Sequence, residues 1–313
     1  MRILITGGAG FVGSNLAERL TRDGHAVTVF DDLSAGSLSF LEKCRERPDF
    51  RFVQGDLLDL PAITEAVGGH DVVFHLAANS DIERGRHESD RDFRLGTVAT
   101  FNVLEATRRA NIKQLVFSSS SVVYGEPMRS PTPECYGPLL PISLYGASKL
   151  ACEGLISAFA HNYGIQSWIF RFANICGRHG THGAIVDFIR KLRKNPSELE
   201  VLGDGKQAKP NLHVSECVDG IIFGWKHSSD EVNYFNLGCE GATAVDDIAR
   251  YVIAALGLRD VRVTHTGGER GWKGDVPQVR LDVSKMKSLG WEAHLSSDRA
   301  VERACRELAG EIT

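Results

Sequence analysis

Tyr145 and Lys149 stand four residues apart at the start of a stretch, residues 145–163, that has the character of a helix. On a helix this spacing places the phenol and the ammonium on one face, about one turn apart. A nearby ammonium stabilises a phenolate, so we expect Tyr145 to titrate below the usual tyrosine pKa of about 10 and to transfer protons. The same spacing also arises on many helices by chance, so the rest of the chain must decide between the two interpretations.

A glycine-rich segment follows directly after the first expected strand, residues 2–6. Gly7, Gly10 and Gly13 recur every three residues, and apolar residues at helical spacing come after them. Glycine lets the backbone turn tightly and approach a pyrophosphate, whose charge then lies at the N-terminus of the helix. A strand before the glycines and a helix after them are the context that such a dinucleotide site requires.

Two carboxylates, Asp31 and Asp32, end the second expected strand, residues 26–30. A carboxylate at this strand end accepts hydrogen bonds from the hydroxyls of an adenosine ribose and repels a 2′-phosphate. The position therefore favours NAD over NADP as the cofactor. A solvated turn aspartate is the alternative, and it suits Asp32 better than Asp31.

Further apolar runs rich in β formers predict strands at residues 50–53, 72–76, 115–117 and 167–170. They alternate with helical patterns, which is typical of a doubly wound parallel sheet with its ligand at the carboxyl ends of the strands. The sequence therefore predicts an α/β fold with a Rossmann-type doubly wound parallel sheet.

The composition is that of an ordinary soluble protein, with 313 residues, 42% hydrophobic residues, 24% charged residues and a net charge of −4. This balance argues against a nucleic-acid partner, and no apolar run is long enough to span a membrane. The first strand begins at Arg2, which leaves no room for a signal peptide ahead of it. The seven cysteines are odd in number and form no Cys-x-x-Cys pair. We therefore expect reduced thiols and a cytoplasmic location.

Taken in order, these motifs resemble those of the extended short-chain dehydrogenase/reductases, in the branch that acts on nucleotide-diphosphate sugars. The segments that carry the resemblance are residues 7–13, Asp31 and residues 55–57, 75–78, 118–121, 145–149 and 171–174. The resemblance implies that Ser120 hydrogen-bonds the 4-oxygen of the sugar beside the catalytic Tyr145. It also implies that Lys149 adjusts the pKa of that tyrosine and holds the nicotinamide ribose.

The resemblance further implies which residues contact the two ligands. Those expected to bind NAD are Gly7, Gly10, Phe11, Val12, Gly13, Asp31, Asp32, Asp56, Leu57, Leu76, Ala77, Ala78, Ser118, Tyr145, Lys149 and Phe172. Those expected to bind the sugar nucleotide are Asn79, Ser120, Tyr145, Asn174, Ile185, Lys209 and Arg270. Lys209 stands where an arginine is usual, so the charge is conserved and the bidentate fork is lost. Trp272 also replaces an arginine of related epimerases, which leaves Arg270 or Lys273 to supply the charge.

The residues after Ser120 narrow the expected reaction. The 4,6-dehydratases that resemble this chain carry an Asp-Glu pair there, and the UDP-glucuronate decarboxylases carry a glutamate. Ser121 and Val122 occupy those positions here, so no carboxylate is available nearby for an additional acid/base step. This favours epimerisation at C4 of a sugar of the UDP-glucose/UDP-galactose type through a transient 4-keto sugar. The chain thus resembles the UDP-glucose 4-epimerases most closely.

Other enzymes of the same family stay open as alternatives: a UDP-glucuronate or UDP-N-acetylhexosamine 4-epimerase, a 4,6-dehydratase or a 4-reductase. A reductase needs exchangeable NADPH, which Asp31 disfavours. A non-catalytic NAD-sensing regulator is a further alternative. Its signature is the loss of Ser120, Tyr145 or Lys149, and all three are present.

We expect residues 1–172 to form the NAD-binding Rossmann domain, rejoined by residues of about 211–240, and residues 173–313 to form mainly the smaller substrate-binding lobe. Relatives of this family pair two helices into a four-helix bundle, which implies a homodimer through residues 97–110 and 144–163. The residues expected in its seam are Phe101, Leu104, Leu155 and Phe159.

His179 and His182 lie in a glycine-rich connection, residues 177–183. No Cys, Asp or Glu neighbours them before Asp187, and a glycine loop does not hold two metal ligands rigidly. We therefore expect no metal site, and interpret both histidines as polar residues that line or cover the sugar site.

Overall fold

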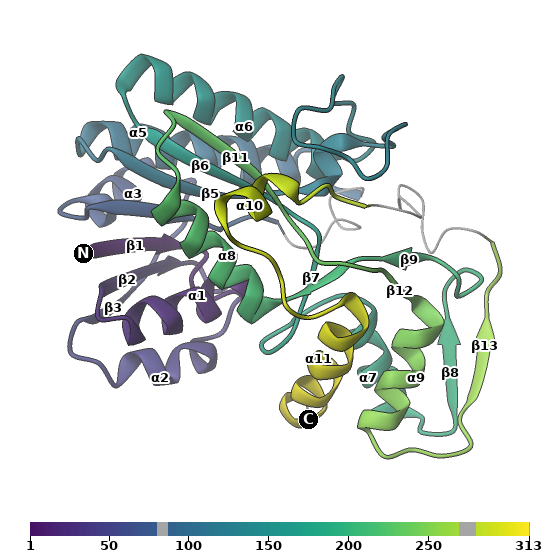
Figure 1. Ribbon diagram of the computed structural model, residues 1–313. Helices are drawn as coiled ribbons and strands as arrows, with labels where there is room; N and C mark the ends of the chain where they lie inside the picture. Colours follow the sequence, from purple (N-terminus) through teal and green to yellow (C-terminus); the bar gives the residue numbers. More distant parts are fainter. Residues whose placement is uncertain (80–86, 269–279, 313) are drawn as a thin grey trace. The chain divides into compact units, whose positions relative to one another are not determined.

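The computed structural model of the protein describes residues 1–79, 87–268 and 280–312. Its central feature is a seven-stranded sheet with the strand order β11-β6-β5-β4-β1-β2-β3 (Figure 1). The strands are β1 (Arg2–Thr6), β2 (Ala26–Asp31), β3 (Phe50–Gln54), β4 (Val72–His75), β5 (Gln114–Ser120), β6 (Gln166–Phe172) and β11 (Val232–Leu237). The pairs β1–β2, β2–β3, β1–β4 and β4–β5 are parallel. The predicted α/β fold with a Rossmann-type sheet is confirmed, and its order reverses between β1 and β4, where such folds bind ligands.

Helices alternate with these strands along the chain. They are α1 (Phe11–Arg22), the short α2 (Glu42–Arg45), α3 (Leu60–Val67), the π-helical turn η2 (Phe93–Val98), α5 (Ala99–Arg109) and α6 (Leu144–Tyr163). Short 3₁₀ turns lie at η1 (Leu38–Leu41) and η3 (Ser121–Tyr124). Local sequence sets the limits of α6, because the Ser143 side chain accepts a hydrogen bond from the Gly146 nitrogen and Gly164 ends the helix with a φ of 62°.

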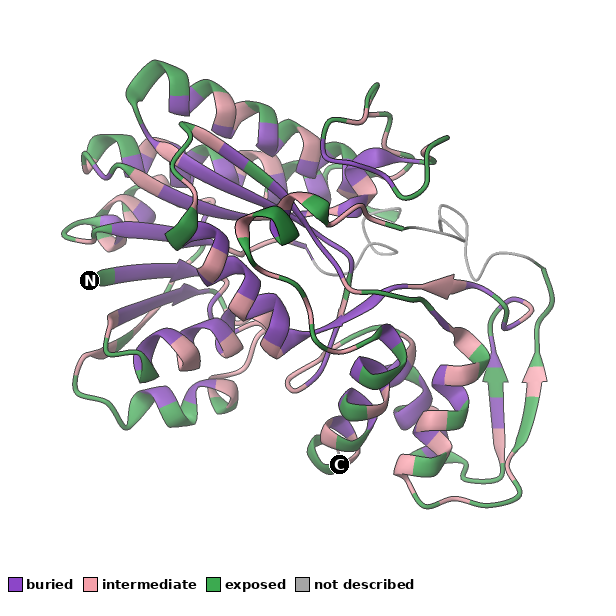
Figure 2. Cartoon of the chain, viewed as in Figure 1, coloured by how far each residue is buried: buried purple, intermediate pink, exposed green. Residues whose placement is uncertain are grey.

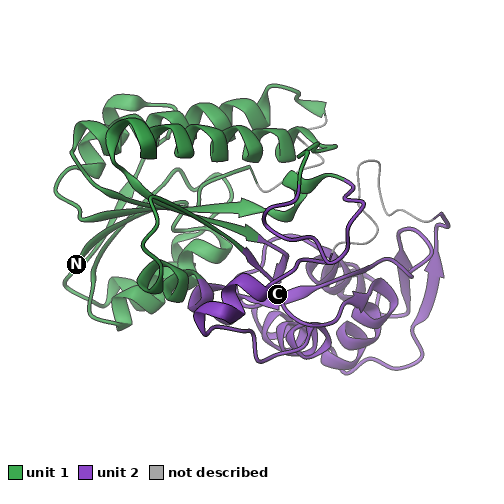
Figure 3. Cartoon of the chain, turned by 45° about the horizontal axis from the view of Figure 1, so that its top comes forward, with its two compact units in different colours: residues 1–125, 137–171, 221–235 green, residues 126–136, 172–220, 236–313 purple. Residues whose placement is uncertain are grey.

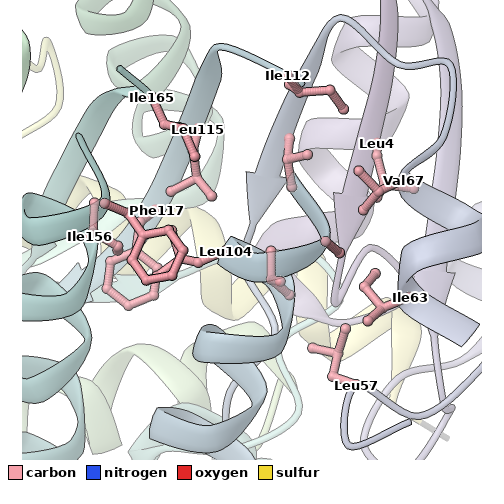
Figure 4. Packing of buried hydrophobic residues seen from close by; sticks show 14 of the residues in the cluster. Leu4, Leu57, Ile63, Val67, Leu104, Ile112, Leu115, Phe117, Ile156 and Ile165 are labelled. Carbon is pink, nitrogen blue, oxygen red and sulfur yellow. The ribbon is translucent and has the colours of Figure 1, made fainter. Parts of the chain in front are cut away.

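A hydrophobic core lies between the central sheet and the helices α3, α5 and α6 (Figure 4). Strand residues such as Leu4 and Phe117 pack there against Ile63 of α3 and Ile156 of α6. Burying a side chain of this size stabilises the fold by ~1.5–3 kcal/mol. Most residues of β1, β2, β4, β5 and β6 are buried, whereas the edge strand β3 and the outer faces of the helices are intermediate or exposed (Figure 2). This core therefore fixes the helices that carry the candidate site.

Two residues expected in a dimer seam belong to this core within the single chain. Leu104 is completely buried and Phe159 is 9% exposed within the single chain. Leu104 therefore offers no surface to a second copy, whereas the Phe159 ring also packs against the exposed Phe101, so the seam stays a prediction. Phe101 is 43% exposed, and Leu155 is partly buried against the core.

The chain divides into two compact units (Figure 3). Unit 1 comprises residues 1–125, 137–171 and 221–235, and unit 2 comprises residues 126–136, 172–220 and 236–313. Both units are thus assembled from segments that are far apart in the sequence.

Unit 2 has a hydrophobic core of its own, formed by three helices and a strand. They are α7 (Ala184–Lys194), α9 (Val245–Ala255), α11 (Ser297–Glu311) and β8 (Glu198–Val201). Two-stranded pairings accompany them: β7 (Asn174–Cys176) with β10 (Asn211–His213), β9 (Ala208–Lys209) with β12 (Thr243–Ala244), and β8 with β13 (Arg262–His265). The remaining helices are α10 (Ser284–Leu289) and α8 (Val214–His227), which runs from unit 2 into unit 1. Over the described part of the chain, no helix has both the length and the apolar character needed to cross a membrane.

Gly7 lies at the end of β1 and approaches the segment that follows β4. Its φ of 68° is in the left-handed region that glycine tolerates best. A Cβ atom at this position would lie 2.5 Å from the backbone nitrogen of Ala77. Both the backbone conformation and the close approach therefore require glycine.

We expect Gly7→Ala to lower the free energy of unfolding more than Gly24→Ala. Gly24 also has a positive φ, 85°, but a Cβ there meets no atom within 4 Å. Gly24→Ala therefore costs only the left-handed strain of roughly 1–2 kcal/mol. Gly7→Ala must in addition displace the backbone at Ala77. Chemical denaturation of both variants measures the difference, and equal losses would contradict the importance of the close approach.

Candidate active site

The first two turns of α6 carry Tyr145 and Lys149. The Nζ atom of Lys149 donates a hydrogen bond to the carbonyl oxygen of Ser118, at 2.6 Å. The same atom lies 5.8 Å from the centre of the Tyr145 ring. Ser118 is the third residue from the end of β5, and Ser120 is its last residue. The structure thus brings the tyrosine, the lysine and the serine segment together in unit 1.

The environment of Tyr145 differs from the expectation of a lowered pKa. Burial raises the pKa of this phenol above its ordinary value, and the negative charge of Asp92 raises it further. A hydrogen bond with the Ser120 side chain acts in the opposite direction. The expected lowering by Lys149 is therefore wrong for this arrangement, because the cost of a buried phenolate exceeds the effect of the ammonium, which is directed at Ser118.

Lys149 is itself strongly affected by its surroundings. The residue is 3% exposed, and burial lowers its pKa to about 8, while charge on Cys152 and Glu153 opposes the decrease. Below this pH the amine carries its positive charge, and it loses that charge as the pH rises through about 8. The charge state of Lys149 near neutral pH therefore depends on its burial and on the neighbouring Cys152 and Glu153.

The glycine segment and the loop after β4 form a cradle of backbone atoms. An added Cβ at Gly13 would collide with the Gly7 carbonyl oxygen, whereas one at Gly10 would approach only that oxygen, at 3.2 Å. Gly10 precedes α1, whose first turn contains Phe11, Val12 and no acidic residue. A helix N-terminus of this kind favours an anionic group. The half-buried Leu76, Ala77 and Ala78 follow β4, and the backbone of Leu76 and Ala77 lies close to Gly7.

Asp31 links the end of β2 to this glycine segment. Its carboxylate accepts hydrogen bonds from the Ala9 nitrogen at 2.9 Å and from the Leu33 nitrogen at 2.8 Å. Burial raises the pKa of Asp31, and these two backbone hydrogen bonds oppose the rise. Asp32 is exposed, and its carboxylate accepts from the nitrogen and the hydroxyl of Ser34. The cradle and the held carboxylate of Asp31 fit a dinucleotide with an unmodified adenosine ribose, whereas Asp32 has the geometry of a turn residue.

Other expected ligand residues of unit 1 have partners within the chain. Asp56 is exposed and accepts a hydrogen bond from the Leu58 nitrogen, and the carbonyl of Leu57 accepts one from Asn102.

Asn79, expected to contact the substrate, is only 6% exposed. Its amide nitrogen donates to Asp92 at 2.9 Å and its oxygen accepts from Arg91. Its side chain therefore holds the buried Asp92, a residue near Tyr145 that no sequence motif indicated.

The residues of unit 2 that are expected to contact a ligand differ in how far they are buried. Asn174 is exposed on β7 and Lys209 is half-buried on β9. Phe172, at the end of β6, is 9% exposed. Ile185 is 6% exposed and belongs to the core of unit 2, so packing accounts for its side chain. The expected contact through Arg270, and the alternatives Trp272 and Lys273, lie outside the described residues.

The glycine-rich connection before α7 is attached to α11. The His179 nitrogen donates to Glu311 at 2.8 Å, and the Arg178 nitrogen donates to Glu307 at 3.1 Å. The His182 ring is within hydrogen-bonding distance of the Thr181 hydroxyl, at 3.1 Å. Among the residues that the structure describes, no three His, Cys, Asp or Glu side chains are grouped to hold a metal ion.

The fold, the nucleotide cradle and the Tyr145–Lys149 pair agree with comparisons to known proteins. The NAD dependent epimerase/dehydratase family matches residues 3–238. The chain belongs to this family of NAD-dependent enzymes that act on nucleotide-diphosphate sugars.

Among its relatives, a UDP-glucose 4-epimerase from Mycolicibacterium smegmatis is 30% identical over 304 residues, 95% of each chain. A UDP-N-acetyl-alpha-D-glucosaminuronate decarboxylase from Bacillus cytotoxicus is also 30% identical, over 92% of this chain and 91% of its own. A crystal structure of a UDP-galactose 4-epimerase is 38% identical with a TM-score of 0.89, and each chain is covered completely.

We expect the dinucleotide released from the denatured protein to be NAD. We also expect Asp31→Ala to reduce the amount that is retained, because the variant removes the carboxylate beside the cradle. Asp32→Ala is the matched control and should retain far more, because the Asp32 side chain faces Ser34 in a turn. Chromatography of the released dinucleotide tests both statements. Recovery of chiefly NADP, or equal losses in the two variants, would contradict the role of Asp31.

Proposed function

We propose that this protein is a UDP-sugar 4-epimerase, which interconverts UDP-glucose and UDP-galactose through a transient 4-keto sugar. The observation that carries this proposal is the grouping of Tyr145, Lys149 and the end of β5. The residues after Ser120 are Ser121 and Val122, so the serine segment supplies no carboxylate for elimination or decarboxylation. The similarity to 4-epimerases over almost the entire chain supports the same reaction.

The chain's own residues would act on the hydroxyl at C4 of the sugar. Tyr145 takes the proton of that hydroxyl and later returns it to the same oxygen. Ser120, whose side chain lowers the pKa of the phenol, also orients the 4-oxygen. NAD, held by the glycine cradle and Asp31, would supply reversible hydride transfer at C4. Since the hydride and the proton both return, no external redox partner is consumed.

Because Tyr145 is buried, we assign Lys149 a function in its ionisation. A buried phenolate is costly, so ionisation of Tyr145 depends on nearby positive charge. Lys149 is the cation of α6 one turn away, and its position beside Ser118 also suits an anchor for the nicotinamide ribose. We therefore assign it both functions.

Incubation with UDP-glucose, UDP-galactose, UDP-N-acetylglucosamine and UDP-glucuronate tests the reaction. We expect UDP-glucose and UDP-galactose to interconvert without an added oxidant or reductant. The products are separated by chromatography and released carbon dioxide is measured. Decarboxylation of UDP-glucuronate, or formation of a dehydrated 4-keto sugar as the final product, would contradict the proposal.

Tyr145→Phe should lower turnover about 10²–10⁴-fold, the usual loss for a positioned acid/base group. The ring still fills its space, so NAD content and the free energy of unfolding should change little. Tyr163→Phe is the matched control, because Tyr163 is the last residue of the same helix and is 46% exposed. Turnover of both variants with the best UDP-sugar decides the question, and near-normal turnover of Tyr145→Phe would refute the assignment.

Lys149→Ala and Ser120→Ala should differ in their pH dependence. Without the ammonium, no nearby positive charge favours the Tyr145 phenolate, so the remaining activity of Lys149→Ala should move to higher pH. NAD retention should also weaken. Ser120→Ala should lower turnover and retain NAD, with a smaller displacement to higher pH, because it removes one neutral hydroxyl near the phenol rather than a charge. The pH–rate profiles and the NAD content of the purified variants provide the measurement, and identical profiles would contradict the assigned functions.

We also propose that the protein is a homodimer that pairs α5 and α6 with those of a second copy. Phe101 is 43% exposed on α5, and its ring lies 6.1 Å from that of Phe159. Phe101→Glu should therefore yield monomers in light scattering at micromolar concentration. Met128→Glu, at a residue 95% exposed in unit 2, is the control and should leave the dimer intact. A monomeric wild-type protein would contradict the proposal.

A further inference from the structure

Glu153 lies two turns beyond Tyr145 on the same face of α6 and is almost completely buried. Its carboxylate accepts three hydrogen bonds. Ser119 Oγ donates to Oε1 at 2.6 Å, and Arg171 donates from Nε to Oε1 at 3.0 Å and from Nη2 to Oε2 at 2.7 Å. The side chains of the ion pair are 7% and 8% exposed. This is a bidentate ion pair with a serine hydroxyl bound to it, all within unit 1.

Arg171 extends this group of contacts to the residues after β5. Its Nη1 atom donates to the Tyr124 hydroxyl at 2.9 Å, and its guanidinium lies 4.9 Å from the centre of the Tyr124 ring. Tyr124 is the last residue of η3, the 3₁₀ turn that starts directly after Ser120. The ion pair therefore contacts the chain before Ser120, through Ser119, and after it, through Tyr124.

Two attachments consequently join α6 to the end of β5. Lys149 binds the carbonyl of Ser118, and Glu153 binds the hydroxyl of Ser119. Ser120, whose side chain lowers the pKa of Tyr145, is the next residue. The hydrogen bonds of Ser118 and Ser119 to α6 thus fix the distance between Tyr145 and the Ser120 hydroxyl, although Ser119 and Glu153 do not themselves reach the reacting atoms.

Stability alone is a weak reason for this arrangement. Removing two charges from water is costly, and apolar residues of similar volume often stabilise a protein equally well or better. Side chains that hold reacting groups must, however, be locked by hydrogen bonds of their own, because a misplacement of about 1 Å can cost about 10²-fold in rate. A bidentate ion pair with a third hydrogen bond supplies this kind of constraint.

We propose that Glu153, Arg171 and Ser119 are positioning residues for the acid/base site, which hold the end of β5 against α6 so that Ser120 and Lys149 keep their places beside Tyr145. The inference rests on the proposed function of those three residues. Glu153 also has an electrostatic effect, because its negative charge one turn from Lys149 favours the ammonium. Cys152 on α6 acts on the same amine, and His75 on β4 faces it as a neutral ring, since burial lowers the pKa of that histidine to about 3.

The first test compares two buried serines of the same unit. Ser119→Ala should lower kcat roughly 10- to 100-fold with little change in KM or NAD content, because substrate and cofactor are still bound but Ser120 is displaced. Ser167→Ala is the matched control. Ser167 is completely buried at the start of β6, and its hydroxyl donates to the Ile165 carbonyl. An equal kcat for Ser119→Ala and Ser167→Ala would overturn the proposal.

The second test separates positioning from stability. Glu153→Leu combined with Arg171→Met removes both charges and leaves no unpaired ion in the core. We expect this double variant to unfold at nearly the same denaturant concentration as the wild type and still to show the reduced kcat. Recovery of wild-type kcat together with wild-type stability would show that the ion pair only fills space.

A third measurement does not depend on the substrate. Glu153→Gln should move the titration of Lys149 to lower pH, and Ser167→Ala should leave it in place. NMR of protein labelled with ¹³C-lysine reports this titration, with Lys149→Ala to assign the signal. If the wild type converts no UDP-sugar, the proposed function fails, but a displaced titration still supports the electrostatic effect of Glu153 on Lys149. An unmoved titration overturns it.

Discussion

The attachment of α6 to the end of β5 is the constraint on which the candidate site depends. A lysine that is 3% exposed must satisfy its ammonium within the protein, and it does so on the carbonyl of Ser118. That hydrogen bond, together with the one between Ser119 and Glu153, places α6, and with it Tyr145, beside the last residues of the inner strand β5. Burial of apolar side chains in the core drives α6 against the sheet, and the polar contacts determine which residues of α6 lie beside the end of β5.

The same burial that orders the site also determines its acid/base behaviour. A phenol and an amine removed from water both resist their charged forms, so the pKa of Tyr145 rises and that of Lys149 falls. Electrostatic effects of neighbouring groups are larger in such surroundings than in water. Proton transfer is therefore controlled by a small number of charges close to the pair.

Overall similarity separates the members of this family poorly. A 4-epimerase and a decarboxylase are each 30% identical to this chain over more than nine tenths of its length. A shared fold binds the dinucleotide and the sugar nucleotide in all of them, and the reaction is decided by a few residues around the reacting carbon. The proposed epimerisation depends in this respect on Ser121 and Val122, at positions where the resemblance implies carboxylates in the alternatives.

The amino-acid sequence by itself determined six of the seven strands of the central sheet, all but β11, together with the glycine cradle and the pairing of Tyr145 with Lys149. These features depend on local periodicity, turn chemistry and a spacing of one helical turn, all of which are readable along the chain. Side-chain partners from distant segments were decided only by the tertiary structure. Ser119 and Glu153 are 34 residues apart and Glu153 and Arg171 are 18 residues apart. The engagement of Asn79 with Asp92 and the rise in the pKa of Tyr145 follow likewise from burial, which exists only after the elements have packed together.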